Sequence, residues 1–349
     1  MGMPLDMAAP GAKISLGEDR FGRRVGVGKA SAGTSLGGDL ILDRIRKLKA
    51  NIESVFMGKP GVVDRVLATL FAGGHCLIED VPGVGKTVLA KALAQSLDVT
   101  FRRIQFTPDL LPGDILGVPV YSAEREDFVF KRGPVFANVV LADEINRTTP
   151  RTQSSLLEAM SECQVSVDGV AHQLPVPFIV MATQNPVEYE GTYPLPESQL
   201  DRFLMRLSVG YPGPSDELKI LLAQKEHHPL DSCRAVMTGD EVMGIREVVK
   251  KVGVEESIGR YILDIVDATR ASQILELGSS PRGSLALYRA AQSWAFMAGR
   301  DYVVPDDVKE VATDVLAHRL ICKRSFAGFD SASSREVVTQ ILEEVPVPA

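Results

Sequence analysis

The sequence predicts an α/β core followed by a smaller domain made of helices, and two observations carry this prediction. Between Cys76 and Tyr211, short apolar runs rich in β-branched residues alternate with helical stretches, as in a parallel sheet that helices cover on both faces. After the break at Pro212-Gly213-Pro214, only amphipathic helical patterns follow. We therefore expect a flexible tail over residues 1–38, an α/β core over 39–211 and an all-α domain over 212–349.

The composition of the 349-residue chain is that of an ordinary soluble globular protein, with 45% hydrophobic and 24% charged residues. No apolar run approaches the roughly 20 residues needed to cross a bilayer, and the N-terminus lacks the apolar core of a signal peptide. The four cysteines are widely spaced, which suits reduced thiols better than a disulfide framework. We expect a cytoplasmic protein without membrane insertion. The net charge of −7 disfavours nucleic-acid binding as its main role.

The first predicted elements are two helices that follow a glycine-rich segment without apolar periodicity, which we interpret as the flexible tail. Residues 39–56 place apolar side chains at alternating steps of four and three, which predicts one buried helical face. These side chains are Ile41, Ile45, Leu48, Ile52 and Val55. A second helical pattern follows and stops at Gly73-Gly74.

Apolar runs predict the strands of the core, and amphipathic patterns predict the helices of the second domain. The runs are "CLIED", "FRRIQF", "NVVLADE", "FIVMAT" and "RLSVGY". The helices are expected at about 215–226, 239–252, 256–275, 282–298 and 305–319. Two insertions also predict hairpins. "GVPVYSAEREDFVFKRGPVF" has two strand patterns around a charged turn, and "CQVSVDGVAHQLPVPFIV" carries the hairpin signal Asp168-Gly169.

The stretch "CLIEDVPGVGKTVLA" predicts a phosphate-binding loop between a strand and a helix. Gly83, Gly85, Lys86 and Thr87 match the second half of the pattern G-x-x-x-x-G-K-[ST]. Glycines let backbone amides approach a phosphate, and the positive end of the following helix adds to the attraction. Lys86 is expected to reach the β- and γ-phosphates, and the Thr87 hydroxyl is expected to bind Mg²⁺. Asp80 stands where the pattern opens with glycine. Since the phosphate-facing amides come later in the loop, we expect the cradle to survive.

Two further strands end in polar residues that suit the hydrolysis of a nucleotide. "NVVLADE" ends in Asp143 and Glu144, at the carboxyl edge where open α/β sheets bind their ligands. Asp143 would hold Mg²⁺ through water, and Glu144 would orient and polarise the attacking water. "FIVMATQNP" brings Asn185 to the end of its strand, where the amide could position the same water. The alternative for Asn185 is a turn signal, since Asn-Pro is common in turns.

Two arginines follow these strands and are candidate catalytic residues. Arg202 lies at a helix-to-strand junction in "PESQLDRFLMRL", and Arg282 opens a helix of the second domain in "SSPRGSLAL". A guanidinium stabilises the charge that develops on a transferring γ-phosphate. A lone arginine is usually a solvated surface residue, but both of these stand where a helical lid and a neighbouring subunit would approach.

The order of these motifs resembles that of an AAA+ ATPase, and more closely that of the MoxR family. The blocks that carry the resemblance are "VFMGKPGVVDRVLATLFAGGHCLIEDVPGVGKT", "QFTPDLLPGDILG", "DEINRTTPRTQSSLLEAM" and "PLPESQLDRF". The similarity covers about residues 40 to 325. It implies an AAA+ P-loop NTPase core with a helical lid. It also makes Asp80 an ordinary variant, because MoxR proteins often do not keep the first glycine of the loop.

The resemblance further implies a role for each candidate residue. It implies Walker A at Lys86 and Thr87, Walker B at Asp143 and Glu144, sensor 1 at Asn185, an arginine finger at Arg202 and sensor 2 at Arg282. ATP would be held by Pro82, Gly83, Val84, Gly85, Lys86, Thr87 and Val88, with its adenine near Gly58 and Lys59, and Mg²⁺ by Thr87 and Asp143. Assembly into a hexameric ring is a further implication.

The resemblance favours chaperone-like remodelling of a protein client as the use of the energy. MoxR relatives are associated with the maturation of enzyme complexes and the insertion of metal cofactors, often beside a von Willebrand factor A-domain partner. Two alternatives stay open, a DNA or RNA motor and a regulatory scaffold that hydrolyses ATP slowly. The intact Glu144, Asn185 and Arg202 argue against an inactive site.

The two hairpins bear on the choice between a protein and a nucleic acid, because they resemble the helix-2 insert and pre-sensor-1 hairpin of AAA+ machines. The second has no Lys or Arg from Cys163 to Val180, and the charges of the first cancel. A sequence-independent grip on phosphates needs excess positive charge, so a nucleic-acid partner is disfavoured. A separate metal site at His227, His228 and Cys233 is also disfavoured, since it lacks a fourth ligand and a known spacing.

Overall fold

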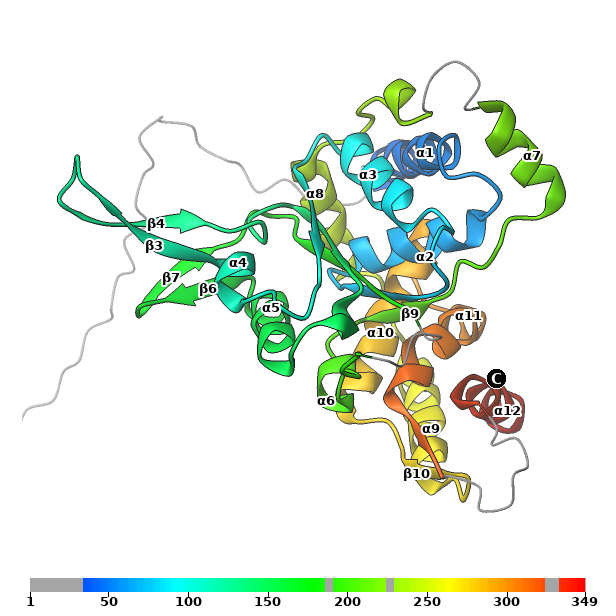
Figure 1. Cartoon of the computed structure of the whole chain (residues 1–349). Helices are drawn as coiled ribbons and strands as arrows, with labels where there is room; N and C mark the ends of the chain where they lie inside the picture. Colours follow the sequence, from blue (N-terminus) through cyan, green and yellow to red (C-terminus); the bar gives the residue numbers. More distant parts are fainter. Residues whose placement is uncertain (1–33, 186–190, 224–228, 324–332, 349) are drawn as a thin grey trace, which may run out of the picture.

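The computed structural model describes residues 34–185, 191–223, 229–323 and 333–348. A central parallel sheet has helices on both of its faces, and a group of helices lies below it in the view of Figure 1. The expected combination of a parallel sheet with a helical domain is confirmed. Most of the predicted tail lies outside the described residues, and the first helix already begins at Thr34.

The sheet brings the ends of its strands to one edge. Its strands are β1 (Cys76–Glu79), β2 (Phe101–Gln105), β5 (Val139–Asp143), β8 (Ile179–Gln184) and β9 (Met205–Leu207). Their spatial order is β2-β5-β8-β1-β9, and all neighbours are parallel. Because parallel strands share one direction, the segments that follow β1, β5 and β8 meet at the carboxyl edge, where such sheets bind ligands.

The side chains of each strand alternate between two hydrophobic clusters, one on each face of the sheet. In β5, Val139 and Leu141 belong to the larger cluster, whereas Val140 and Ala142 belong to the smaller one. Helices close the larger cluster: α1 (Thr34–Glu53), α2 (Pro60–Phe71) and α3 (Lys86–Ser96). The smaller is closed by α4 (Pro112–Leu116) and α5 (Pro150–Glu162). The central strands are therefore buried on both sides.

The face predicted for the first helix is the face that the protein buries. Ile45, Leu48, Ile52 and Val55 are buried, and Ile41 packs partly buried against the same cluster. The second predicted helix, α2, ends at Phe71, just before the positive-φ glycine Gly73. In both helices the apolar periodicity of the sequence matches the packing.

Both predicted hairpins form, and they project from the same side of the molecule (Figure 1). The first pairs β3 (Gly117–Ser122) with β4 (Asp127–Arg132), and the second pairs β6 (Gln164–Val167) with β7 (Val170–Gln173). Asp168 and Gly169 have φ values of 51° and 78°, as a two-residue turn with positive φ at both positions requires. The rings of Phe130 and His172 stack with centroids 4.2 Å apart, so the two hairpins contact each other.

The C-terminal region is helical, as predicted, with two additions. Its helices are α7 (Pro214–Ala223), α8 (Gly239–Val249), α9 (Glu256–Ala271), α10 (Pro281–Met297), α11 (Pro305–Leu316) and α12 (Ser334–Glu344). The sequence analysis predicts neither α12 nor the antiparallel pair β10 (Leu275–Leu277) and β11 (Ile321–Cys322). The end of the helix expected over 256–275 is therefore wrong, because the chain leaves α9 after Ala271 to enter β10. A strand of three residues is too short for its alternation to be distinguished from a helical pattern.

Short helical turns complete the fold. They are η1 (Ile145–Arg147), α6 (Glu197–Leu200), η2 (Pro229–Ser232) and η3 (Ala317–Arg319). The larger cluster continues from the sheet into α8, α9, α10, α11 and α12. The helical region thus packs on the core through one continuous apolar interior. Among the described residues, none of the helices is both long enough and apolar enough to span a membrane.

Candidate active site

The loop between β1 and α3 has the backbone that phosphate binding needs. Gly83 and Gly85 have φ values of 86° and 91°, a region that residues with a side chain rarely adopt. Gly85 precedes the first residue of α3, Lys86, so the loop leads straight into the positive end of that helix. A Cβ at Gly85 would lie 3.2 Å from the ring of Phe56, so a side chain there would also crowd the wall of the site.

Asp80 is a structural anchor for this loop. Its Oδ2 accepts hydrogen bonds from the backbone N–H groups of Val209 and Gly210, both at 2.6 Å, and from the Ser208 hydroxyl at 3.1 Å. Its Oδ1 accepts from the N–H of Val81 at 2.8 Å. Burial alone would raise the pKa of this carboxyl, but these hydrogen bonds outweigh it and lower the pKa below the ordinary value. Asp80 therefore ties the start of the loop to the segment after β9.

A cavity of about 340 Å³ opens between the loop and the carboxyl edge of the sheet. It is lined by Pro82, Gly83, Gly85, Lys86, Thr87, Val88, Arg103, Asp143, Glu144, Thr183 and Asn185. The Nζ of Lys86 donates to the backbone carbonyl of Asp80 at 2.6 Å. Burial lowers the pKa of Lys86, while the charges of Asp80, Asp143 and Glu144 oppose that shift. The fold thus brings the predicted Walker A, Walker B and sensor 1 residues together around one space.

The two carboxylates at the end of β5 are held by residues of the neighbouring strands. The Thr183 hydroxyl donates to Asp143 Oδ1 at 2.6 Å and accepts from the backbone N–H of Glu144 at 2.8 Å. Arg103 donates from Nε and from a terminal nitrogen to Asp143 Oδ2, at 2.9 and 2.6 Å. Gln105 donates to the Glu144 carboxylate at 2.8 Å. The backbone of Glu144 is left-handed, with φ 57°, which turns its side chain out of the direction of the strand.

Arg103, Gln105 and Thr183 are site residues that the sequence analysis missed. The signal for the first two was the strand "FRRIQ", where polar residues alternate at positions 103 and 105 of β2. The register pairs Arg103 with Leu141 and Gln105 with Asp143. Both polar side chains therefore arrive beside the carboxylates. Only the strand order β2-β5 reveals this, and the sequence does not give that order.

A second cavity, of about 200 Å³, adjoins the first and shares Gly83, Gly85 and Val88 with it. Its other lining residues are mostly apolar: Val55, Phe56, Met57, Lys59, Val84, Val209, Gly210, Pro212, Ile220 and Pro229. Lys59, one of the two residues expected near the adenine, lines this cavity. Gly58 does not line this cavity but a neighbouring hollow, where a Cβ would lie 2.7 Å from that of Asp216.

The two candidate arginines lie away from both cavities of their own chain. Arg202 donates to the Leu157 carbonyl at 2.6 Å and to the Ser161 hydroxyl at 2.5 Å, at the end of α5. Arg282 is exposed in the first turn of α10. Neither residue lines the cavity that holds Lys86 and Glu144. Within one chain, these arginines are therefore not part of the site around the phosphate loop.

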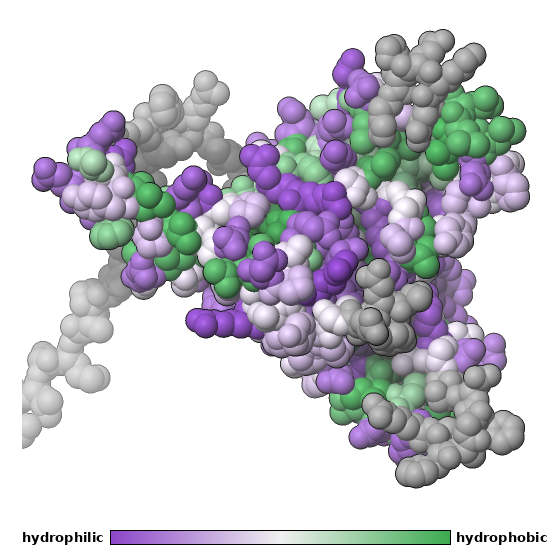
Figure 2. All heavy atoms as spheres, viewed as in Figure 1, coloured by the Kyte–Doolittle hydropathy of each residue, from purple (hydrophilic) through white to green (hydrophobic). Residues whose placement is uncertain are grey.

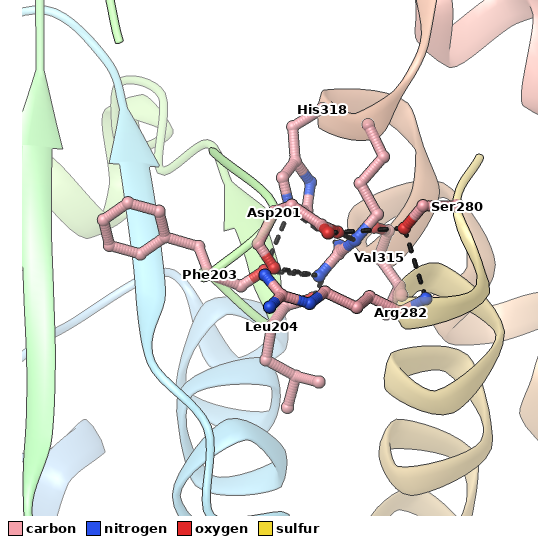
Figure 3. A network of polar contacts seen from close by, with 8 residues as sticks. Asp201, Phe203, Leu204, Ser280, Arg282, Val315 and His318 are labelled. Atoms are coloured by element: carbon pink, nitrogen blue, oxygen red, sulfur yellow. Dashed lines mark hydrogen bonds and ion pairs between the residues drawn. The ribbon is translucent and has the colours of Figure 1, made fainter. Parts of the chain in front are cut away.

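A network of polar contacts joins the surroundings of these two arginines (Figure 3). Arg319, whose side chain is 3% exposed, forms an ion pair with Asp201 at 2.8 Å. Asp201 also accepts from the Ser280 hydroxyl at 3.3 Å, and that hydroxyl accepts from the N–H of Arg282 at 3.2 Å. The same network therefore includes Asp201, the residue before Arg202, and the backbone N–H of Arg282.

The donor set of the main cavity suits a magnesium-bound nucleotide. Mg²⁺ prefers oxygen ligands and is commonly held through one or two carboxylates beside phosphates, and Thr87 and Asp143 supply a hydroxyl and a carboxylate. In the described ranges, no group of three or more His, Cys, Asp or Glu side chains could hold a metal ion by itself. His227 and His228 lie outside the described residues. Cys233 is buried within hydrogen-bonding distance of Asn51 and Ser96.

Comparison with known proteins also indicates an ATPase. The model of the "ATPase family associated with various cellular activities (AAA)" matches residues 75–205, and that of the AAA lid domain matches 267–341. The uncharacterised protein YeaC of Bacillus subtilis is 49% identical over 302 residues, 86% of this chain and 94% of that protein. Chaperone MoxR1 of Mycobacterium tuberculosis is 42% identical over 306 residues, 85% of this chain and 80% of that protein. The crystal structure of a candidate ATPase from Cytophaga hutchinsonii superposes with a TM-score of 0.82 at 38% identity, covering 89% and 97% of the two chains.

The sheet order, the phosphate loop and the lid define an ATPase of the AAA+ class. Relatives that carry the MoxR name match along most of the chain, at 42% identity in Mycobacterium tuberculosis and 28% in Paracoccus denitrificans. The chain belongs to the MoxR family of AAA+ ATPases.

Proposed function

We propose that this ATPase hydrolyses magnesium-bound ATP in an oligomeric ring, and that it uses the energy to remodel or mature protein complexes. The observation that carries the proposal is the pair of joined cavities. One is polar, with Lys86, Asp143 and Glu144 around it, and the other is apolar. A triphosphate in the first and an adenine in the second account for both linings.

In this proposal each residue of the polar cavity has one task. The amides around Gly83 and Gly85 and the ammonium of Lys86 bind the phosphates, and Thr87 and Asp143 hold Mg²⁺, which would neutralise charge on the phosphate oxygens. Glu144 orients and polarises the attacking water, and Asn185 holds that water from the other side. Gln105 and Arg147 already contact the Glu144 carboxylate, at 2.8 and 3.2 Å. Both contacts are made to Oε2, and the carboxylate has a second oxygen to offer the water.

We assign the arginine finger to Arg202 and sensor 2 to Arg282, both acting on a neighbouring subunit. Neither lines the nucleotide cavities of its own chain, which supports action across an interface. Apolar side chains on α7 support the existence of such an interface: Leu218, Leu221 and Leu222 are 56%, 67% and 63% exposed. In Figure 2 this hydrophobic surface gathers over α7, at the upper right. A hexameric ring is the assembly that we propose.

The client in this proposal is a protein rather than a nucleic acid. The hairpin β3-β4 exposes Val118, Val120, Tyr121 and Phe128, each by 45% or more. Apolar and aromatic side chains of this kind suit contact with a protein. A von Willebrand factor A-domain partner and metal-cofactor insertion belong to the same proposal, as does a cytoplasmic location. The DNA or RNA motor and the slow scaffold are the alternatives.

The experiment that tests the proposed reaction is the replacement Glu144→Gln. The variant should bind ATP, since the phosphate cradle is untouched, and should lose hydrolysis, because an amide cannot act as the base. Glu158→Gln, on the exposed side of α5, is the matched control and should keep the wild-type rate. A Glu144→Gln variant that turns over ATP near the wild-type rate would remove Glu144 from this role.

The same hydrolysis-blocked variant tests the client. Captured with ATP, it should retain protein partners that the wild type releases, and Phe128→Glu in the β3-β4 hairpin should weaken that capture. Tight binding to DNA at moderate salt, or hydrolysis stimulated by DNA, would instead support the nucleic-acid motor. Hydrolysis that stays slow with every protein fraction would support the scaffold.

A further inference from the structure

Among the described residues that line the phosphate cavity, Arg103 is the one arginine, and its guanidinium is already hydrogen-bonded there. It lies on β2 and donates two hydrogen bonds to a single oxygen, Asp143 Oδ2, at 2.9 and 2.6 Å. Asp143 is the carboxylate to which the proposed function assigns Mg²⁺. A cationic side chain and a metal cation thus have the same partner.

The lone pairs of Asp143 decide whether both cations fit. Oδ2 accepts two N–H groups from Arg103, and a carboxylate oxygen has two lone pairs to offer. Oδ1 already accepts the Thr183 hydroxyl at 2.6 Å. Of about four acceptor positions on the carboxylate, three are therefore filled before any metal-bound water approaches. A divalent cation at this carboxylate would also stand close to the guanidinium and be repelled by it.

We propose that Arg103 and Mg²⁺ exclude each other at Asp143, so that Arg103 must leave the carboxylate when the magnesium nucleotide binds. This inference rests on the proposed function. The difference in exposure favours replacement of Arg103 by Mg²⁺, because the Asp143 side chain is 16% exposed whereas that of Arg103 is 49% exposed. The carboxylate is fixed from both sides, while the long arginine side chain has open space to move into.

The exchange also reaches Glu144. The terminal nitrogen of Arg103 that donates to Asp143 also donates to the side-chain Oε1 of Gln105, at 2.7 Å. The Nε2 of the same side-chain amide donates to Glu144 Oε2, at 2.8 Å. Arg103 thereby orients Gln105 toward Glu144. Release of Arg103 would remove that orientation, so arrival of the metal would loosen the hold on the carboxylate that polarises water.

The chain provides a matched control in the preceding residue. Arg102 lies on the same strand and is exposed, and side chains of neighbouring strand residues point to opposite faces. Its guanidinium donates to the backbone carbonyl of Phe101, at 3.5 Å. Removing either arginine changes the net charge by the same amount. A difference between the two variants therefore reports the contact with Asp143.

The experiment measures binding of the fluorescent, non-hydrolysable analogue mant-AMP-PNP while Mg²⁺ is titrated, with wild type, Arg103→Ala, Arg103→Lys and Arg102→Ala. Arg103→Ala should lower the Mg²⁺ concentration at half-saturation by about three- to tenfold, the size of effect expected for a partly exposed, charge-assisted pair. Arg103→Lys should lie between Arg103→Ala and wild type. Arg102→Ala should match wild type. Because the readout is binding, it is independent of the hydrolysis rate.

The possible outcomes test the exclusion at Asp143 and the proposed nucleotide site separately. If wild type binds the analogue but Arg103→Ala needs the same or a higher Mg²⁺ concentration, the exclusion is refuted and the proposed nucleotide site stands. If wild type fails to bind the analogue at any Mg²⁺ concentration, the proposed function falls, and this inference falls with it. Loss of analogue binding in Arg103→Ala without Mg²⁺ would show a phosphate contact and would also overturn the exclusion.

Discussion

The replacement Arg319→Met should destabilise the protein by about 3–5 kcal/mol, because it strips several buried acceptors of their donor. The Arg319 side chain is 3% exposed and lies where η3 meets the segment that enters β9. It donates to the Asp201 carboxylate at 2.8 Å, to the Phe203 carbonyl at 2.7 Å and to the Leu204 carbonyl at 3.3 Å. It also contacts the carbonyl of Val315, on the last turn of α11.

The magnitude follows from what remains after the change. Methionine fills most of the volume but carries no charge and donates no hydrogen bond, so the Asp201 carboxylate loses its cationic partner. Breaking a buried pair in this way costs about 3–5 kcal/mol, and each buried carbonyl left without a donor would cost about 1–3 kcal/mol more. Ser280 still donates to Asp201, and the Asp201 side chain is 15% exposed. We therefore expect about 3–5 kcal/mol rather than the full sum.

Guanidinium denaturation followed by circular dichroism measures this loss. The matched control is Arg260→Met on α9, where the arginine is 74% exposed and pairs with Glu256 one turn away. Such surface pairs contribute about 0.3–0.5 kcal/mol. If Arg319→Met shifts the free energy of unfolding by less than about 1 kcal/mol, as the control should, then the buried network does not fasten the lid to the core.

Three further predictions concern the loop, the interface and pH. Asp80→Ala should destabilise the protein by about 2–4 kcal/mol, because the amides of Val209 and Gly210 lose a charged acceptor. A melting temperature equal to that of wild type would contradict this. Mixing Lys86→Ala with Arg202→Ala subunits should restore ATPase activity, since an intact loop from one meets an intact arginine from the other. Proven mixed rings without activity would place Arg202 within its own subunit. Burial lowers the pKa of His75 to about 4, below its ordinary value of 6.5. The unfolded chain therefore binds the extra proton, and stability that is present above pH 6.5 should fall by about 3 kcal/mol as the pH drops to about 4. His75→Gln should flatten that part of the pH profile in denaturation experiments, and an unchanged slope would exclude His75 as its cause.

Local signals were sufficient wherever a motif and its structural context lie close together in the chain. The phosphate loop was recognised from Gly83 to Thr87 because the strand before it and the helix after it are adjacent in sequence. The turn at Asp168-Gly169 was recognised for the same reason. In each case a few neighbouring residues determine the backbone.

A local signal is also present for α12, in the residues at its N-terminus. Ser333 accepts from the N–H of Glu336, and the Glu336 carboxylate accepts from the N–H of Ser333. The spacing Ser-x-x-Glu before an apolar pattern is a known start of a helix. The helix could therefore have been predicted.

Contacts that depend on strand order could not be predicted. Arg103 meets Asp143 only because β2 and β5 are neighbours in the sheet, although 40 residues separate them in the chain. The position of Arg202 against α5 likewise depends on packing between distant segments. One sequence indicates which strands exist, but their order follows from the summed packing of the whole interior.

The anchoring of Asp80 has a consequence for how this site can change by mutation. Two of its partners after β9 are backbone N–H groups, at positions 209 and 210. Any residue except proline supplies that group, so the tie itself does not depend on either side chain, although φ 66° at Gly210 and the burial of Val209 restrict these two positions for other reasons. Methods that search for pairs of positions varying together would therefore miss this contact. The two shortest contacts of the aspartate at the head of the loop are thus made to the main chain opposite it, and they require no matching side chain there.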